Sequence, residues 1–199
     1  MYEPKNMKPT VQVLTTSGTY ICPATCKYIQ VYIVGGGGGG GGGSNTMAGG
    51  GGGPGKVLLA YFPAADYVYV IGSAGTGGAI NSDGTAGTTT TFNGKSAAGG
   101  SFGNNPFTVP ALAASSSSTT VAGTARLGMI AAQAGMVGDT SGNGGTNMFG
   151  LNGKGFQSTT LSQNGAVGTL FGGGGSGGLG ATGTGGAGVK GGCIVIEHY

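Results

Sequence analysis

The chain has 199 residues, of which 51 are glycine, and eight Lys and Arg against five Asp and Glu give it a net charge of +3. The basic residues are scattered, which disfavours a nucleic-acid partner or an anionic membrane surface, because both need clustered basic side chains. A hydrophobic content of 38% with only 7% charged residues disfavours a disordered chain, since disordered segments have the opposite balance. We therefore expect one ordered glycine-rich β domain that spans residues 1–199.

The N-terminal segment has the pattern of short β-strands. Residues 10–14 and 18–21 flank Thr15-Thr16-Ser17, which favours a hairpin between two strands. Residues 27–34 alternate aliphatic side chains with polar or aromatic ones, as a strand with one buried face does. We expect residues 10–34 to supply core strands of the domain.

Nine consecutive glycines, residues 35–43, follow directly on the strand predicted at 27–34. Each glycine costs about 0.5–1 kcal/mol more than alanine to fix in a regular element, so the tract either stays disordered or recovers that entropy by packing. A chain without side chains can form an extended helix with three residues per turn, whose N–H and C=O groups point outward and need lateral partners. We therefore expect packed extended polyglycine (type II) helices, with turns at residues 44–47 and 147–149.

The remaining strand candidates lie on either side of a stretch that is poorer in glycine. Residues 56–62, 67–71 and 88–93 are rich in β-branched and aromatic side chains. Residues 106–134 form a less glycine-rich insert, and residues 193–199 form a closing core strand. Together with the N-terminal strands, this pattern predicts an all-β fold in which a small β-sandwich core of the jelly-roll type carries the polyglycine helices.

The chain is poorly supplied with catalytic side chains. His198 is the single histidine, and a partly exposed residue at the end of a strand is favoured over a general base. Asp66, Asp83 and Asp139 lie in turn sequences, where aspartate is common for structural reasons, and a glycosidase pair remains only as an alternative. Gly94-Lys95-Ser96 resembles the end of a phosphate-binding loop, but the first glycine of that motif is missing. We expect no enzymatic activity and no cofactor.

The three cysteines, Cys22, Cys26 and Cys193, leave two arrangements to weigh. A zinc site could be drawn from all three with His198, but Cys193 and His198 are an odd number of residues apart on a strand and point to opposite faces. A disulfide between Cys22 and Cys26 remains an alternative, although buried free thiols are favoured. We expect no metal site.

Several segments together resemble the glycine-rich domains of phage-type tail-fibre and virion proteins, some of which are adhesins that contain polyglycine. The likeness begins with residues 16–31, Thr-Ser-Gly-Thr-Tyr-Ile-Cys-Pro-Ala-Thr-Cys-Lys-Tyr-Ile-Gln-Val, and continues through Val34-Gly35 into the nine-glycine tract. Further matching segments follow in the same order at residues 56–59, 67–72, 87–92 and 194–197. The likeness covers most of the chain except residues 106–134.

The resemblance implies a non-enzymatic virion structural protein, in a tail or fibre or elsewhere on the particle surface, that serves host attachment through receptor binding by its loops. As receptor-display residues we select Asn45, Met47, Phe102, Phe107, Asn147, Met148, Phe149 and Phe156, which stand in glycine-rich surroundings. For each phenylalanine alone, a place in the small core is the favoured alternative. The functional alternatives are a minor capsid or cement protein that stabilises particle assembly without a receptor, and an enzyme such as a glycan depolymerase.

The expected partners are other virion proteins and a host-surface receptor, without nucleic acid and without membrane insertion. The N-terminus lacks the apolar segment of a signal peptide, so we expect synthesis in the host cytoplasm and incorporation into the virion. Few charges and apolar strand faces favour a homo-oligomer, for which a trimer is one option, although no heptad pattern sets the number.

Overall fold

The computed structural model describes residues 8–45, 47–105, 141–151, 153, 155 and 162–199. These residues contain ten strands and no helix, so the described part of the chain offers no helix able to cross a membrane. The strands are β1 Thr10–Leu14, β2 Gly18–Tyr20, β3 Tyr28–Val34, β4 Val57–Pro63, β5 Tyr67–Val70, β6 Thr90–Phe92, β7 Lys95–Ala97, β8 Gly150–Leu151, β9 Thr169–Leu170 and β10 Gly192–His198. The insert expected at 106–134 lies outside the described residues.

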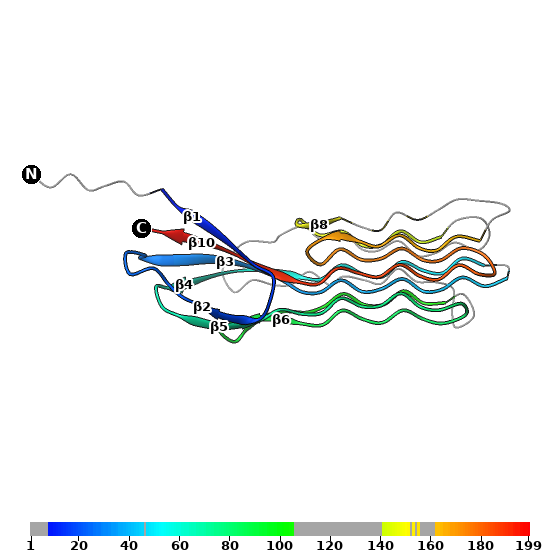
Figure 1. Cartoon of the computed structure of the whole chain (residues 1–199), viewed down its shortest axis with the longest axis horizontal. Helices are drawn as coiled ribbons and strands as arrows, with labels where there is room; N and C mark the ends of the chain where they lie inside the picture. Colours follow the sequence, from blue (N-terminus) through cyan, green and yellow to red (C-terminus); the bar gives the residue numbers. More distant parts are fainter. Residues whose placement is uncertain (1–7, 46, 106–140, 152, 154, 156–161) are drawn as a thin grey trace, which may run out of the picture.

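Eight of the strands form two four-stranded antiparallel sheets at one end of the molecule (Figure 1). One sheet has the order β1-β10-β3-β4 and the other has the order β2-β5-β6-β7, while β8 and β9 form a separate two-stranded sheet. The predicted all-β class is therefore confirmed and both sheets are antiparallel, whereas a jelly-roll arrangement is not confirmed.

The core of this region forms around one phenylalanine ring. Phe92 of β6 is fully buried, and its ring centroid lies 5.2–6.2 Å from those of Tyr20, Phe62, Tyr67 and Tyr69. Aromatic pairs at such separations contribute about 0.5–1.5 kcal/mol each beyond the area they bury. The alternate residues of β3 complete the core, because its pattern buries every second side chain, as the sequence predicts.

The predicted hairpin between β1 and β2 is wrong. β1 pairs along its whole length with β10, from Thr10 opposite Glu197 to Leu14 opposite Cys193, whereas β2 pairs with β5 in the other sheet. Residues 15–17 therefore carry the chain from one sheet to the other instead of reversing it within one sheet. A local turn pattern cannot distinguish these outcomes, because the true partner of β1 lies at the opposite end of the sequence.

The glycine-rich segments extend from the two sheets as a bundle of long tracts side by side (Figure 1). Neither helix nor strand is assigned to residues 35–43, so the expected polyglycine helices are not among the observed elements. The tract is nevertheless ordered by lateral hydrogen bonds of 2.8–3.0 Å, in which its N–H groups donate to three neighbouring tracts in rotation. The first neighbour accepts from Gly35, Gly38 and Gly41 through the carbonyls of Lys56, Gly53 and Gly50. The second accepts from Gly36, Gly39 and Gly42 through the carbonyls of Thr88, Thr85 and Ser82. The third accepts from Gly37, Gly40 and Gly43 through the carbonyls of Val189, Gly186 and Gly183.

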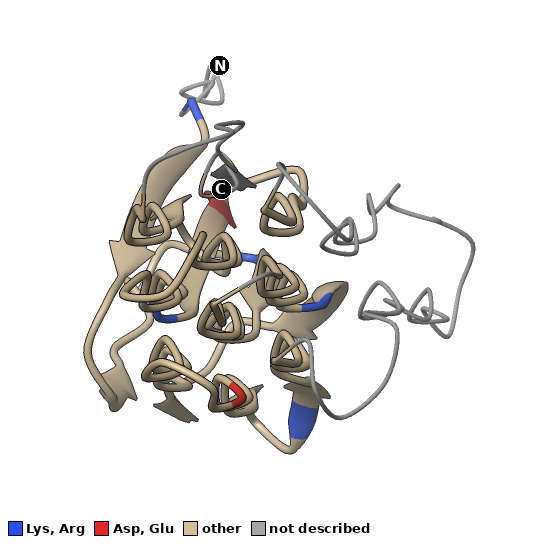
Figure 2. Ribbon diagram, turned by 90° about the vertical axis from the view of Figure 1, so that its right-hand side faces the viewer, with Lys and Arg blue, Asp and Glu red and all other residues tan. Residues whose placement is uncertain are grey.

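The carbonyl groups of the same tract accept hydrogen bonds from three further neighbours. Gly75, Gly78 and Asn81 donate to Gly37, Gly40 and Gly43; Gly100 and Gly103 donate to Gly36 and Gly39; Gly175 and Gly178 donate to Gly38 and Gly41. As the residue number rises along the central tract, the residue numbers of its partners fall in the three accepting neighbours and rise in the three donating neighbours. The three accepting neighbours therefore run antiparallel to the central tract, and the three donating neighbours run parallel to it. Residues 35–43 are thus the buried central tract of a bundle seen end-on in Figure 2.

The spacing of the tracts explains why glycine is required in the centre. A Cβ added to Gly39 would lie 2.0 Å from the carbonyl oxygen of Thr76, and one added to Gly40 would lie 2.1 Å from that of Ser176. Real Cβ atoms do not approach a backbone oxygen this closely, so a side chain would force neighbouring tracts apart and break their hydrogen bonds. The absence of side chains thus allows the backbones to satisfy one another directly.

Candidate functional site

Three turns of the glycine tracts meet at the end of the bundle that lies away from the two sheets (Figure 1). The first turn holds Ser44, Asn45 and Met47, and the Ser44 N–H donates to the Met47 carbonyl at 2.9 Å. The second comprises residues 79–82 and the third residues 180–183. We call these residues, 44, 45, 47, 79–82 and 180–183, the tip.

Gly43 joins the three turns of the tip. Its N–H donates to the carbonyl of Gly183 at 2.8 Å, and its own carbonyl accepts from the N–H of Asn81 at 3.0 Å. Asn81 has a φ of 58° and Gly180 a φ of 72°, the left-handed conformation that asparagine and glycine adopt most readily in turns. Backbone hydrogen bonds therefore hold the tip in one arrangement.

The tip presents polar and apolar side chains to solvent. Asn45 is exposed, and Ile80 is 40% exposed although it is a large aliphatic residue. Next to the tip, the carboxylate of Asp83 accepts hydrogen bonds from the backbone N–H of Asn105 at 2.6 Å and from its side-chain amide at 2.9 Å, which ties the adjacent tract to the tip. Amide and aliphatic groups of this kind can recognise a partner through hydrogen bonds and apolar contacts.

Of the predicted display residues, the structure places Asn45 and Met47 together in the tip. Phe102 is 41% exposed on the flank of the bundle, between Gly100 and Gly103, which donate to the central tract. Phe107 and Phe156 lie outside the described residues.

Asn147, Met148 and Phe149 lie near the sheets instead of the tip. The amide of Asn147 is buried and donates to the carbonyls of Gly55 at 3.0 Å and Phe171 at 3.2 Å. Phe149 packs edge-to-face against Tyr32 of β3 with ring centroids 5.3 Å apart, while Met148 is exposed. The predicted display set therefore occupies separate places on the surface.

Sequence reasoning missed Ile80 and Asn81 as members of the tip. The signal was present, because residues 80–84 read Ile-Asn-Ser-Asp-Gly, a cluster of turn residues after a glycine-rich tract. The third turn, at residues 180–183, carries a weaker signal because it lies within a longer run rich in glycine.

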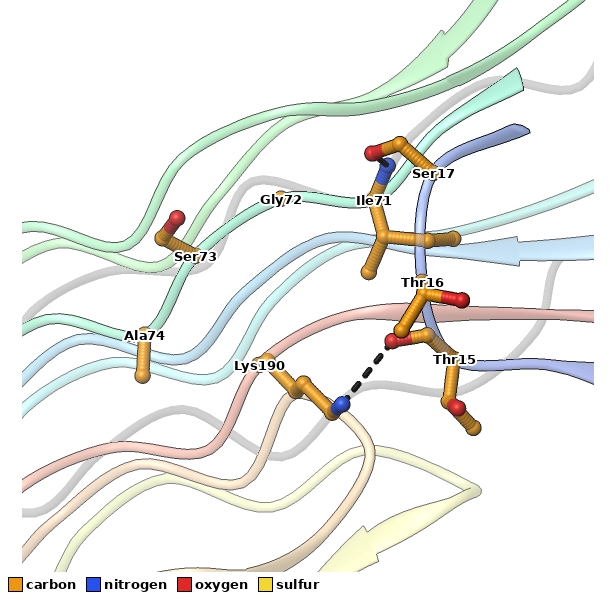
Figure 3. Close-up of a pocket in the computed structure, with 8 residues that line it drawn as sticks. All are labelled: Thr15, Thr16, Ser17, Ile71, Gly72, Ser73, Ala74 and Lys190. Carbon is orange, nitrogen blue, oxygen red and sulfur yellow. Dashed lines mark hydrogen bonds between the residues drawn. The ribbon is translucent and has the colours of Figure 1, made fainter. Parts of the chain in front are cut away.

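A second candidate site lies where the sheets join the bundle (Figure 3). It is an open groove of about 370 Å³ lined by Thr15, Thr16, Ser17, Ile71, Gly72, Ser73, Ala74 and Lys190. The ammonium group of Lys190 donates to the carbonyl of Thr15 at 2.8 Å, and the N–H of Ile71 donates to Oγ of Ser17 at 2.9 Å. These two bonds fix the β1–β2 connection against the glycine tracts.

The titratable groups of the described residues do not converge on one site. Glu197 is buried between the sheets, Asp66 accepts the N–H of Cys22 at 2.8 Å, and the ring of His198 stacks on Tyr28 at 4.4 Å. Within the described ranges, no three His, Cys, Asp or Glu side chains gather as a metal site would require. Asp139, one of the aspartates weighed for catalysis, lies outside them.

The three cysteines are free thiols, and the structure holds no bond between Cys22 and Cys26. Cys26 donates weakly to the carbonyls of Tyr28 at 3.3 Å and His198 at 3.5 Å. Burial raises the pKa of the Cys193 thiol to about 12, so this group stays protonated at neutral pH. These are properties of packed core residues, not of a nucleophile or a ligand set.

Comparison with known proteins gives one positive result. No curated protein matches the chain. A family profile described as a glycine-rich domain matches residues 13–196, which include the β2-β5-β6-β7 sheet, most of the β1-β10-β3-β4 sheet and the glycine tracts between them. This description names no virion, tail fibre or receptor. The chain belongs to the glycine-rich domain family.

Proposed function

We propose that this protein is a non-enzymatic virion component of the tail, fibre or particle surface, and that its tip contacts a host receptor. The observation that carries the proposal is the position of the tip, three turns held together at Gly43 at the far end of an extended bundle. Resemblance to glycine-rich tail-fibre and virion domains supplies the biological setting.

The proposal includes the geometry of the tracts, which we infer to be type II polyglycine helices. Donors of the central tract change partner at each residue and return to the same neighbour every third residue. A three-residue period is what an extended helix with three residues per turn requires. In a lattice of this kind every tract supports the others, so the tip is held by the whole bundle.

A rigid support favours recognition by the tip. Binding by a mobile loop costs the entropy of ordering it, at about 0.5–1.5 kcal/mol for each side chain that becomes immobilised. A tip whose backbone is already fixed avoids part of this cost. Exposed Ile80 and Asn45 then provide an apolar contact and an amide for hydrogen bonds within one small surface.

The tip is tested by measuring adsorption of the labelled protein to host cells. We expect the double variant Asn45→Asp with Ile80→Asp to bind at least about tenfold more weakly, a loss of about 1.4 kcal/mol. The variant Lys95→Gln changes an exposed residue of β7 and should bind as the wild type does. Equal binding by all three proteins, or no binding by the wild type, would refute the receptor role.

A capsid or cement protein is the second candidate, because one outer sheet face is apolar and exposed. Val11 is 60% exposed, Val13 is 54% exposed and Tyr61 is 63% exposed. Exposed apolar patches on a sheet are typical of surfaces that contact another protein. Imaging of antibody-labelled particles separates the two candidates, since a repeated position across the capsid shell would favour the cement protein and a tail or fibre position the attachment protein.

A further inference from the structure

The groove at the junction of the sheets and the bundle is distinct from the tip. One wall is the connection between β1 and β2, residues 15–17, and the other is formed by residues 71–74 and Lys190 of two glycine tracts (Figure 3). These tracts lie side by side, because the N–H of Gly191 donates to the carbonyl of Gly72 at 2.9 Å. The groove is therefore bounded on both sides by fixed backbone.

The charge of the groove comes from Lys190. Its ammonium group uses one donor on the carbonyl of Thr15, and an ammonium group has three. Two hydrogens remain to be directed at a ligand. None of the eight lining residues is acidic, so nothing within the groove neutralises the cation. A carboxylate placed beside it would receive charge-assisted hydrogen bonds, which are about twice as strong as neutral ones.

The other lining groups are hydroxyls and small apolar surfaces. Four of the eight lining residues carry a hydroxyl group, namely Thr15, Thr16, Ser17 and Ser73. Oγ of Ser17 accepts from the N–H of Ile71, which leaves its own hydrogen to be donated to a ligand. Ile71 and Ala74 add apolar side chains to the lining, and the side chain of Ile71 lies between Ser17 and Lys190 (Figure 3).

We propose that the groove binds a saccharide that carries a carboxylate. The carboxylate contacts the ammonium group of Lys190, the ring hydroxyls exchange hydrogen bonds with Ser17 and Ser73, and the C–H face of the ring packs on Ile71. A volume of about 370 Å³ accommodates a ligand of this size, since small-molecule sites typically have about 300–1,000 Å³. The proposal is independent of receptor binding by the tip.

Titration calorimetry of the full chain with D-glucuronate, D-glucose and acetate tests this assignment. We expect binding of glucuronate at millimolar concentrations, weaker binding of acetate, which lacks the ring, and no binding of glucose, which lacks the charge. Lys190→Gln should weaken glucuronate binding by about tenfold or more. Lys95→Gln removes an equal charge from β7, which does not line the groove, and should leave the affinity unchanged.

A second variant tests the groove without altering its charge. Ala74→Leu places a larger side chain among the lining residues and should also reduce glucuronate binding. An unfolding transition like that of the wild type shows that this variant keeps the fold. Absence of glucuronate binding, equal affinity for acetate, or equal loss in Lys190→Gln and Lys95→Gln would each overturn the assignment.

Discussion

Tyr20 and Glu197 join the two sheets, because the tyrosine hydroxyl of β2 donates a 2.8 Å hydrogen bond to Oε1 of the glutamate in β10. The carboxylate is buried and also accepts hydrogen bonds from Gln12 at 2.6 Å, from Tyr199 at 2.8 Å and from Thr10. Four neutral donors thus replace the water that a buried carboxylate has lost. Because Thr10 and Gln12 belong to β1, this network also attaches the first strand to the core.

We predict that Tyr20→Phe lowers the free energy of unfolding by about 2 kcal/mol. The ring remains, but the charged acceptor loses one donor, and a hydrogen bond to a charged group contributes about 1.5–3 kcal/mol. Tyr69→Phe is a matched control, because Tyr69 is also a buried tyrosine stacked near Phe92 and should tolerate loss of its hydroxyl. Chemical denaturation of both variants measures the difference, and equal values would contradict the role of the bond.

The lowered pKa of Glu197 predicts that the protein loses stability in acid. Burial by itself raises the pKa of this carboxyl, but the hydrogen bonds from Thr10, Tyr20, Tyr199 and Gln12 outweigh it and hold the pKa below its ordinary value. A pKa that is lower in the folded state stabilises the protein above the unfolded pKa of about 4.3, and this contribution disappears as the pH falls through the folded pKa. We expect Glu197→Gln to be less stable at pH 7 and to lose less stability than the wild type in acid. Melting temperatures between pH 7 and pH 3 test this, and parallel curves would refute it.

The thiols of Cys22 and Cys193 are expected to react at different rates. Burial raises the pKa of Cys193 to about 12 and is also the largest cause of the raised pKa of Cys22. Cys22 is only half-buried, however, so an aromatic disulfide reagent at pH 8 should label it first. Cys193 should react only after unfolding. Equal rates for Cys22 and Cys193, or a mass that reveals a disulfide, would contradict this prediction.

Central glycines should tolerate no side chain. Gly39→Ala places a Cβ 2.0 Å from the carbonyl oxygen of Thr76, so we expect it to destabilise the protein by more than about 4 kcal/mol or to prevent folding. Gly94→Ala is the control, because its Cβ meets no atom within 4 Å and only the positive φ of 73° opposes it, at about 1–2 kcal/mol. Thermal unfolding and amide hydrogen exchange of residues 35–43 measure the effect of each variant. Similar effects of the two variants would show that close packing does not explain the glycine content.

The edge strand β1 is expected to drive self-association. Among the described strands it pairs with β10 alone, and its residues Val11 and Val13 are exposed, with no charge or proline in the strand to protect the open edge. Val13→Lys should therefore reduce self-association in sedimentation experiments. Val68→Lys changes an exposed valine in the other sheet and serves as the control. Monomeric wild-type protein would contradict the prediction.

Local patterns predicted the strands better than their partners. The sequence predicts β1, β3, β4 and β10, and it predicts β3 most clearly because alternate side chains of that strand are buried. β7 was missed, since Lys95-Ser96-Ala97 has little β preference and is a strand only through its pairing with β6. The glycine tracts offer no side chains that distinguish one neighbour from another, so their arrangement could not be derived.

The candidate site was predicted only in part. Asn45 and Met47 were selected because they interrupt glycine, and both lie in the tip. Asn147 has the same local context but is buried, where its amide binds the carbonyls of Gly55 and Phe171. A non-glycine segment between two tracts can lie at the tip or near the sheets. Its place depends on the length and direction of the tract before it, and composition alone does not reveal these.

The rotation of partners around the central tract limits how the length of the bundle can change. Removal of a single residue from any tract would turn every later amide away from its acceptor, whereas removal of three would restore the alignment. The neighbours must then shorten as well, or their own amides lose partners. Insertions and deletions compatible with this architecture therefore come in triplets and in several tracts together, so the distance between the tip and the sheets varies in discrete steps.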